Sequence, residues 1–317
     1  MTIDAPLLLR AAAAAAGGQQ YPAPALYVVA TPIGNLADLT LRAIHVLALA
    51  DAVACEDTRI GGALLRHLGL AKELLAVHAH NERAAAAAVV ERLERGQRVA
   101  YVSDAGTPAV SDPGAVLVAA ARAAGHRCVP VPGPGSALAA LSVAGDTTGG
   151  GFSFVGFLAA RAGERTAQVR RLAVDPRTQV LFEAPHRIAA LAGALAEACP
   201  ARPVTACREL TKQFETVVTL PAAELPAWLA ADAHRLRGEF VLVLHALPAH
   251  AVAPADDDAA DRLLAALLRE LPLKTAVALA AEASGAPRNA LYRRALALRG
   301  AAADREAAPG DASRADS

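Results

Sequence analysis

Short apolar runs alternate along the first half of the chain with stretches whose apolar residues recur at helical spacing. One run is "RVAYV", which a loop rich in Pro and Gly, "SDAGTPAVSDPG", joins to the helical stretch "AVLVAAARAAG". The same plan recurs in "LYVVATPIGN", which leads into "LADLTLRAIHVLALA", and in "CVPVPGPGSALAAL", where a helix is expected from Ser136. Strands that alternate with helices predict an α/β fold with a parallel sheet.

Polar residues stand at the ends of these predicted strands. Two further apolar runs, "DAVACEDTR" and "LLAVHAHNER", also end in polar residues. In a sheet of this kind ligands bind outside the carboxyl ends of the strands. Five polar strand ends are therefore expected to face one crevice.

The loops at these strand ends limit the kind of ligand. None of them matches GxGxxG or GxxxxGK[ST], so the dinucleotide and P-loop motifs are absent. Proline fixes the backbone and glycine permits a close approach, so such loops offer rigid carbonyls and a few amides beside carboxylates. That set suits a base, a ribose and a positive centre, the three parts of S-adenosyl-L-methionine. The alternative is that they are only tight turns between strands and helices.

Composition excludes several classes of protein. The 317 residues suffice for about two domains, and 31 basic against 31 acidic residues give a net charge of zero. No general attraction to nucleic acid or membrane follows from that balance, and no run of the sequence predicts a membrane span. The 4 cysteines form no CxxC pair, which favours free thiols of a reducing compartment over disulfides or zinc. No metal site is predicted.

The two ends of the chain are expected to be disordered. Residues 1–24 carry Asp4 and Arg10 in positions that do not fit a secretory signal, so they are interpreted as a disordered leader. Residues 301–317 have almost no large apolar side chain and are predicted to be a disordered tail. The stretch "APADDDAADR" is interpreted as an acidic connector.

A basic segment near the C-terminus predicts a helix, a turn at Ser284–Pro287 and a second helix. Between Lys274 and Arg299 five cations stand against one glutamate, a local excess of positive charge in a neutral chain. Leu291, Leu296 and Leu298 are expected to form an inward apolar face. Two interpretations stay open: an arm that docks RNA, and a helical hairpin packed on the body or on a dimer partner.

Seven motifs in one order carry a family resemblance. They are "LYVVATPIGNLADLTLRAIHVLALADAVACEDTR", "YVSDAGTPAVSDPG", "VPVPGPGSALAAL", "FVGFL", "LFEAPHRI", "CRELTKQFETV" and "GEFVLVL". Together they resemble the tetrapyrrole-methylase superfamily. Within it they are similar to the branch that methylates the 2′-hydroxyl of a cytidine in small-subunit (16S) ribosomal RNA. The match runs from about Leu26 to Leu244, and "GAPRNALY" extends it near the C-terminus.

The resemblance implies an architecture and partners. It implies a two-domain fold, the class III methyltransferase fold, with α/β domains over 25–146 and 151–248 and S-adenosyl-L-methionine between them. A small helical RNA-docking module would follow over 261–300. The implied substrate is 16S rRNA or the 30S subunit, and the implied enzyme is a cytoplasmic homodimer that binds neither DNA nor membrane.

The resemblance also assigns residues to the cofactor. The implied cofactor-binding set is Pro32, Asp104, Ala105, Gly106, Thr107, Val110, Gly135, Ser136, Glu183 and Glu209. Asp104 has the alternative role of shaping its loop, Ser136 that of a helix N-cap, and Asp112 is favoured as a turn cap. Relatives commonly carry a larger residue at the position of Gly135, so only its backbone is expected to touch a ligand.

Polar residues at the remaining strand ends are candidates for catalysis and for substrate binding. Methyl transfer from a sulfonium is an in-line displacement, which needs alignment and is helped by a base near the acceptor oxygen. The catalytic candidates are Lys212, Glu56 and Arg59. The substrate-binding candidates are Asn35, Asp57, Asn81, Glu82, Arg187, Arg288, Arg293 and Arg294. Lys212 has two possible roles, a base of lowered pKa or a cation that neutralises RNA phosphate.

Three other functions compete with this hypothesis. A methylase of the same fold could act on a tetrapyrrole or another small molecule, but the basic helical segment and "RELTKQFET" argue against it. A non-catalytic ribosome-associated protein is disfavoured by the intact cofactor loops. A metal-dependent hydrolase using Asp104 and Asp112 lacks the usual cluster of histidines and carboxylates.

Overall fold

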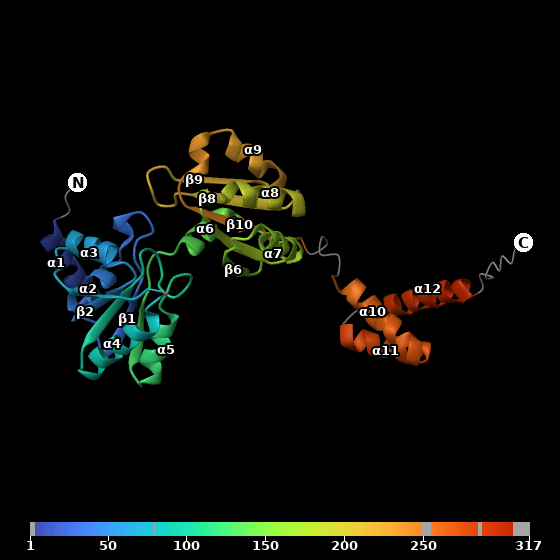
Figure 1. The fold of residues 1–317 in the computed structure, drawn as a ribbon, viewed down its shortest axis with the longest axis horizontal. Coiled ribbons are helices and arrows are strands. Elements are labelled where there is room, and N and C mark those ends of the chain that lie inside the picture. Colours follow the sequence, from blue (N-terminus) through green and yellow to red (C-terminus); the bar gives the residue numbers. More distant parts are fainter. Residues whose placement is uncertain (1–3, 79, 249–254, 285–286, 307–317) are drawn as a thin grey trace, which may run out of the picture. The chain divides into compact units, whose positions relative to one another are not determined.

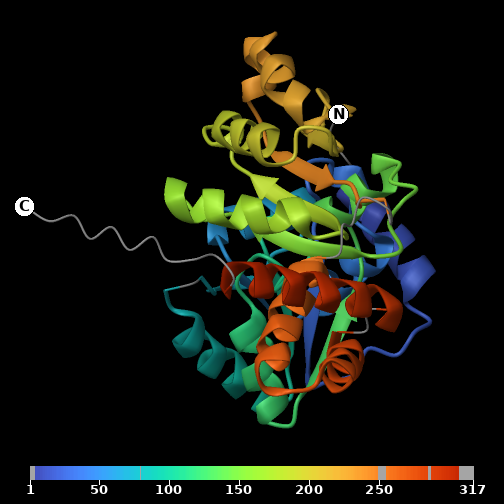
Figure 2. The ribbon, with the colours of Figure 1, turned by 90° about the vertical axis from the view of Figure 1, so that its right-hand side faces the viewer.

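The computed structural model describes residues 4–78, 80–248, 255–284 and 287–306. The chain divides into two compact units, Met1–Leu247 and Pro248–Ser317. The first unit contains two five-stranded sheets (Figures 1 and 2). Among the described residues, no helix combines the length and the hydropathy that a membrane span requires.

The first sheet is fully parallel, as the alternating pattern predicts. Its order is β3-β2-β4-β1-β5. The strands are β1 (Ala25–Val29), β2 (Ala52–Cys55), β3 (Glu73–Ala76), β4 (Arg98–Val102) and β5 (Arg127–Val131). Their helices are α2 (Leu41–Leu49), α3 (Thr58–His67), α4 (Glu82–Glu94) and α5 (Ala115–Ala123), with the short η1 (Leu36–Asp38). Alternate residues of β1 enter opposite cores: Tyr27 packs with α2 and α3, and Leu26 packs with α4 and α5.

The second sheet is mixed. Its order is β6-β7-β10-β8-β9, in which β6 and β7 are parallel and the other pairs are antiparallel. The strands are β6 (Phe152–Phe157), β7 (Thr178–Glu183), β8 (Pro203–Arg208), β9 (Thr216–Pro221) and β10 (Phe240–Leu244). One face is covered by α7 (Ala162–Val174), α8 (Ile188–Ala198) and α9 (Leu225–Ala230), and the short η2 (Ala222–Glu224) and η3 (Ala233–Leu236) flank α9.

Helix α6 (Ser136–Ala144) joins the two sheets. It begins after β5 of the first sheet, yet Ala140 and Ala144 are buried against Val180 and Val243 of the second. The loop that follows is anchored as well, because the Asp146 carboxylate accepts a hydrogen bond from the Ala246 N–H at 2.7 Å. The carboxyl ends of the first sheet are thereby fixed next to the second sheet.

The disordered leader predicted for residues 1–24 is wrong over the residues that the structure describes. Helix α1 (Ala5–Ala16) begins at Asp4, whose side chain accepts a hydrogen bond from the Leu7 N–H at 3.1 Å. Ala12 is fully buried beside α2. Alanine has the highest helix propensity, its small side chain lets α1 approach α2 closely, and Leu8 and Leu9 pack against the same core. Residues 1–3 lie outside the described part.

The second unit is a helical bundle with its own core. It contains α10 (Ala255–Glu270), α11 (Leu273–Ser284) and α12 (Arg288–Glu306), which together bury Leu264, Val277, Ala280, Leu291 and Ala295. The acidic connector is therefore helical from Ala255 onward. The predicted tail is helical up to residue 306, because its alanine-rich start continues α12. Residues 307–317, and residues 285–286 of the predicted turn, lie outside the described part.

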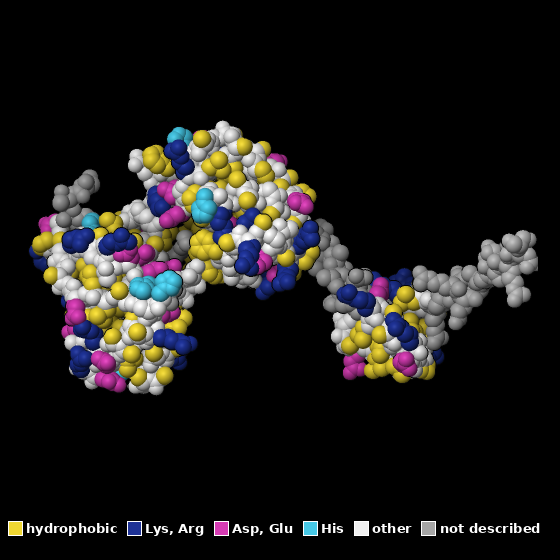
Figure 3. All heavy atoms as spheres, viewed as in Figure 1, with side chains coloured by type: hydrophobic (Ala, Val, Ile, Leu, Met, Phe, Trp, Pro, Cys, Tyr) yellow, Lys and Arg dark blue, Asp and Glu magenta, His cyan; other side chains and the backbone are white. Residues whose placement is uncertain are grey.

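One prediction about the face of α12 is only partly correct. Leu291 is buried as expected, whereas Leu296 is 50% exposed and Leu298 is 39% exposed. Ala295, four residues after Leu291, takes the inward position on the next turn. Arg288 and Arg293 are exposed, while the Arg294 guanidinium lies 3.5 Å from the Asp261 carboxylate. Lys and Arg side chains lie on the face of this unit that Figure 3 shows.

Candidate functional site

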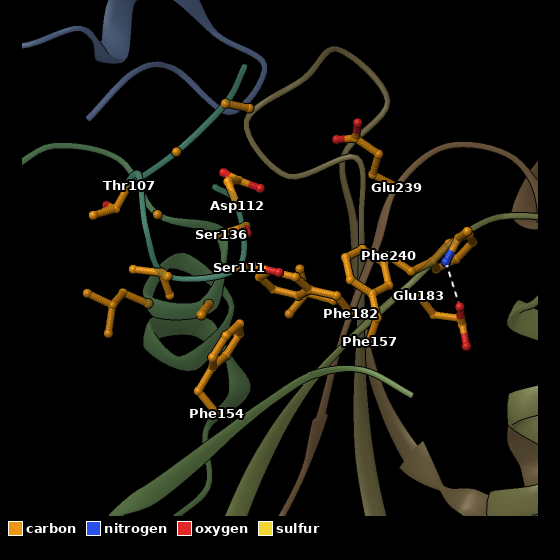
Figure 4. A pocket seen from close by; sticks show the side chains of 18 of the residues that line it. Thr107, Ser111, Asp112, Ser136, Phe154, Phe157, Phe182, Glu183, Glu239 and Phe240 are labelled. Atoms are coloured by element: carbon orange, nitrogen blue, oxygen red, sulfur yellow. Dashed lines mark hydrogen bonds between the residues drawn. The ribbon is translucent and has the colours of Figure 1, made fainter. Parts of the chain in front are cut away.

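A cavity of about 540 Å³ opens where the carboxyl ends of the first sheet meet the second sheet. Its volume lies in the range that holds a cofactor-sized ligand. Seven of the ten residues predicted to bind the cofactor line it: Ala105, Gly106, Thr107, Val110, Gly135, Ser136 and Glu183. Figure 4 shows Thr107, Ser136 and Asp112 on one side of the cavity and the rings of Phe157, Phe182 and Phe240 on the other.

Backbone hydrogen bonds join the loops of the first sheet into one wall of the cavity. Gly106 and Thr31 exchange two N–H···O bonds, of 3.0 and 2.9 Å, which tie the loop after β4 to the loop after β1. Gly106 has φ +76°, a conformation that glycine adopts readily. The Thr107 hydroxyl donates to the Pro134 carbonyl at 3.2 Å, which adds the loop after β5. Three loops predicted separately therefore form one surface.

Ser136 is the first residue of α6, and its predicted role as N-cap is wrong. The N-cap is Gly135, which has extended backbone angles and offers no side-chain cap. Both residues line the cavity, so the first turn of α6 borders it. The amides at a helix N-terminus are free to bind polar ligand atoms.

A wall of phenylalanines was not predicted. The chain has only 6 phenylalanines, and five of them line the cavity: Phe152, Phe154, Phe157, Phe182 and Phe240. The Phe182 ring meets Phe154 and Phe157 edge-on, with centroids 5.0 and 5.6 Å apart. Three of the five stand in "FSFVGF", and this clustering in a chain with 3% aromatic residues was the available signal. The wall gives an apolar face for a flat ring.

Asp104 and Pro32 do not line the cavity in the structure. The Asp104 carboxylate accepts a hydrogen bond from the Asp57 N–H at 3.1 Å, so it holds two loops of the first sheet together. This geometry favours the alternative of loop shaping. Asp112, which was favoured as a turn cap, does line the cavity, and burial raises the pKa of its carboxyl.

Glu56, Asp57 and Arg59 form a polar group beside α3, outside the cavity lining. Asp57 caps the helix by accepting the Arg59 N–H at 2.8 Å, and it also binds the Arg59 guanidinium. That side-chain hydrogen bond lowers the pKa of Asp57 to about 2. Burial, and next the charge of Asp104, raise the pKa of Glu56. Within the described residues, no group of histidines, cysteines and carboxylates could hold a metal ion.

Asn35, Asn81 and Glu82 make structural hydrogen bonds. The Asn35 side chain accepts the N–H two residues on, and the Asn81 side chain accepts the N–H three residues earlier. Glu82 reaches from the start of α4 to the start of α5, where its carboxylate accepts the Gly114 N–H at 2.7 Å. It therefore caps a neighbouring helix, a role that the sequence did not indicate.

Arg187 does not line the cavity, and it makes its contacts at the end of the second sheet. Its guanidinium donates to the Leu158 carbonyl at 2.6 Å and lies 3.0 Å from the carboxylate of Glu183. Glu183 is 2% exposed, and its Oε1 accepts the Ala184 N–H at 2.9 Å. The pair holds the end of β7 against the end of β6, which places Phe157 and Phe182 beside the cavity.

Lys212 lies in an ion-pair group at the rim of the cavity. Its ammonium is 2.9 Å from Glu209 and 3.0 Å from Glu239, and Glu239 lines the cavity. Burial alone would lower the pKa of Lys212, but the hydrogen bonds to both carboxylates outweigh burial and raise it. Of the two roles left open for Lys212, the raised pKa contradicts that of a base of lowered pKa and agrees with a retained positive charge. Glu209 is not part of the lining, since it faces Lys212 and accepts the Glu239 N–H at 2.9 Å.

The Lys212 stem also contacts the first sheet. A Cβ at Gly34, in the loop after β1, would come within 2.5 Å of the Lys212 Cγ. Glycine at this position therefore permits the stem to pack against the loop backbone. Lys212 thus connects the loop after β1 to the β8–β9 connection, residues 209–215.

Two residues of the β8–β9 connection have strained backbones. Glu209 has φ +53° and Thr211 has φ +66°, and the latter is unusual for a β-branched residue. Each costs of the order of 1–3 kcal/mol and persists only where the surroundings fix it. Here the Glu215 carboxylate accepts the Thr211 N–H at 2.6 Å. Strain of this kind is typical of functional loops.

Comparisons with known proteins agree with this geometry. Residues 25–226 match the family model of tetrapyrrole (corrin/porphyrin) methylases, and residues 254–299 match that of the RsmI C-terminal HTH domain. The chain is 46% identical over 277 residues to the ribosomal RNA small subunit methyltransferase I of Escherichia coli O157:H7, covering 87% of this chain and 96% of that one. A relative of the same name from Pseudomonas aeruginosa is 45% identical, with 87% and 98% covered.

Solved structures share the fold of the first unit. Uroporphyrin-III-C-methyltransferase from Thermus thermophilus superposes with a TM-score of 0.51 at 25% identity, covering 69% of this chain and 93% of that one. A structure of that enzyme complexed with S-adenyl homocysteine gives a TM-score of 0.51 at 21% identity, covering 70% and 97%. The resemblance read from the motifs is confirmed, and so is the two-part methylase fold.

Proposed function

The chain belongs to the tetrapyrrole (corrin/porphyrin) methylase family, and from this premise we propose that it methylates small-subunit ribosomal RNA with S-adenosyl-L-methionine. Its close relatives are named ribosomal RNA small subunit methyltransferase I, and the chain matches them over nearly their whole length. The acceptor we propose is the 2′-hydroxyl of a cytidine. The homodimer and the cytoplasmic location stay predictions from the family resemblance.

The observation that carries the proposal is the cavity between the three tied loops and the phenylalanine wall. Its residues fit the cofactor in kind: the rings offer an apolar face to a purine, and Gly106 and Gly135 let backbone approach a ligand closely. The first turn of α6 adds free amides. When bound, the cofactor supplies a methyl group on a sulfonium, and no phosphate-binding motif is needed.

We propose that the acceptor hydroxyl approaches the cavity beside Glu239. Its side chain is 78% exposed, whereas Glu183 is buried and Asp112 is half-buried. A carboxylate in this position can accept the proton of a hydroxyl as it attacks the methyl group. Lys212, which keeps its proton, is a positioning residue that fixes the Glu239 carboxylate at 3.0 Å.

Replacing Lys212 by methionine is expected to lower kcat about fivefold. An exposed ion pair such as Lys212–Glu239 stabilises the position of the carboxylate by at most about 1 kcal/mol, and a barrier higher by that amount lowers kcat about fivefold. Affinity for S-adenosylhomocysteine, measured by calorimetry, should stay within about twofold. Lys72→Met is the control, because Lys72 donates to the Ala48 and Ala50 carbonyls in the first sheet's half and does not touch the cavity. Equal kcat values for wild type and Lys212→Met would contradict the positioning role.

A labelling experiment tests the function itself. Wild-type protein is incubated with methyl-labelled cofactor and with either 30S subunits lacking the modification or a uroporphyrin. Label in the ribosomal RNA, located on the ribose of a cytidine after nuclease digestion, is expected. Label in the tetrapyrrole alone would favour the competing function of the same fold, and the enzyme named in the structural comparison makes that the relevant alternative.

Chelation is expected to leave activity unchanged, because displacement at a sulfonium needs no Lewis acid. The enzyme is first treated with EDTA, and Mg²⁺ is then added in slight excess so that the 30S subunits stay intact while transition metals remain chelated. The initial rate of methyl transfer is compared with that of the untreated enzyme. A loss of rate that Zn²⁺ or Mn²⁺ restores would contradict metal-free transfer.

A further inference from the structure

The sixth phenylalanine of the chain stands apart from the wall. Phe214 lies in the β8–β9 connection and is 68% exposed, more than any of the five phenylalanines of the cavity. A single exposed apolar side chain is ordinary in itself. The setting of Phe214 is unusual, because the loop that carries it is held in a strained conformation beside the cavity.

Several contacts fix the tip of this loop. Arg208 donates from its guanidinium to the Phe214 carbonyl at 3.1 Å and to the Arg237 carbonyl at 2.6 Å. The Glu215 carboxylate accepts the Thr211 N–H, and Lys212 lies between two carboxylates. The ring of Phe214 is therefore exposed on a loop whose backbone is held on both sides. A rigid, exposed aromatic ring can contact a partner with little loss of conformational entropy.

The loop begins at the same sheet edge as the cavity. Arg208, the last residue of β8, pairs with Phe240 of β10, and Phe240 lines the cavity. Two residues before Phe214, the Lys212 ammonium contacts Glu239, another lining residue. Cα atoms two residues apart are at most about 7.6 Å from each other, so the Phe214 backbone lies close to that of Lys212, whose ammonium reaches the rim.

We propose that Phe214 stacks on the base of the nucleotide that is methylated, with the exposed side chain of Gln213 beside it for a hydrogen bond to the base edge. This inference rests on the proposed function. Single-stranded RNA is recognised largely by stacking its bases on aromatic side chains and by hydrogen bonds to their edges. A base stacked at the rim would place its ribose on the side of Glu239 and the cavity. Phe214 thereby becomes a substrate-binding residue of this site.

The test compares Phe214→Ala, Phe214→Leu and Phe214→Trp in methylation of 30S subunits. Stacking of one base is worth ~1–3 kcal/mol, so Phe214→Ala should raise KM about 5- to 150-fold while kcat changes far less. Phe214→Trp should restore KM, because it keeps an aromatic face. Phe214→Leu, which keeps apolar bulk without a ring, should resemble the alanine variant. Affinity for S-adenosylhomocysteine should be equal in all of them.

Val174→Ala is the matched control, since Val174 is 67% exposed on α7 and does not line the cavity. An unchanged KM in Phe214→Ala, or full activity in Phe214→Leu, would overturn the inference. A changed molecular mass of Phe214→Ala in light scattering would assign the ring to a contact between copies of the chain and would overturn it too. Absence of label in 30S subunits with the wild-type protein would instead overturn the proposed function, and this inference with it.

Discussion

The Gly106→Val variant is expected to bind S-adenosylhomocysteine at least about thirtyfold more weakly than the wild type. Gly106 lines the cavity with φ +76°, where a β-branched residue is strained by roughly 1–3 kcal/mol. That strain lowers the stability of the free and the bound protein alike. The affinity falls because the valine side chain takes space that the ligand needs, and overpacking of about 2 kcal/mol gives that factor. Titration calorimetry measures the change directly.

Gly125→Val separates this effect from general instability. Gly125, in the turn between α5 and β5, has φ +79°, and a Cβ there would meet nothing within 4 Å. Both variants should therefore lose similar thermal stability from backbone strain, while only Gly106→Val loses cofactor affinity. If Gly106→Val bound as tightly as the wild type, the tied loops would not form the cofactor site.

The strand-end loops could be predicted because local sequence determines them. Proline and glycine after an apolar run mark a turn at the end of a strand, and the order of such units predicts a parallel sheet. The family resemblance assigned Ala105–Thr107 to the cofactor, and these residues line the cavity. Local sequence also predicted the helix that begins at Ser136, whereas the assignment of Gly135 and Ser136 to the cofactor came from the family resemblance.

Contacts between distant segments could not be predicted in this way. Glu82 caps a helix that begins 33 residues later, and Lys212 packs on Gly34 across 178 residues, so neither partner is visible in local sequence. Burial would lower the pKa of Lys212, and the two carboxylates that raise it are Glu209, a near neighbour in sequence, and Glu239, which only the sheet register brings close. The phenylalanine wall likewise needs three strands, β6, β7 and β10, in one sheet.

The helical unit presents a limited number of cations to RNA. Adjacent helical residues point about 100° apart, so Arg293 and Arg294 cannot both face one groove. In the structure Arg293 is exposed and Arg294 lies against Asp261. The exposed cations among the described side chains of this unit are Arg262, Arg269, Lys274, Arg288 and Arg293, and the last three belong to the basic segment after residue 270. We expect two or three phosphate contacts from this basic segment, with the rest of the affinity assigned to other parts of the protein.

A protein ending at Leu247 is therefore expected to keep its affinity for S-adenosylhomocysteine, because every residue lining the cavity lies before that point. Its binding to 30S subunits should lose about two units of salt slope, since each phosphate contact contributes roughly 0.7–0.9. If the full chain and the truncated protein bind equally at 1 M salt, a difference of two in slope makes the full chain bind about a hundredfold more tightly near 0.1 M salt. Arg288→Ala with Arg293→Ala, in the full chain, should reproduce most of the lost slope while the core around Leu291 stays intact. If the truncated protein instead precipitates or changes its oligomeric state while the double variant binds 30S subunits normally, the unit is structural, and the docking role assigned to it is wrong.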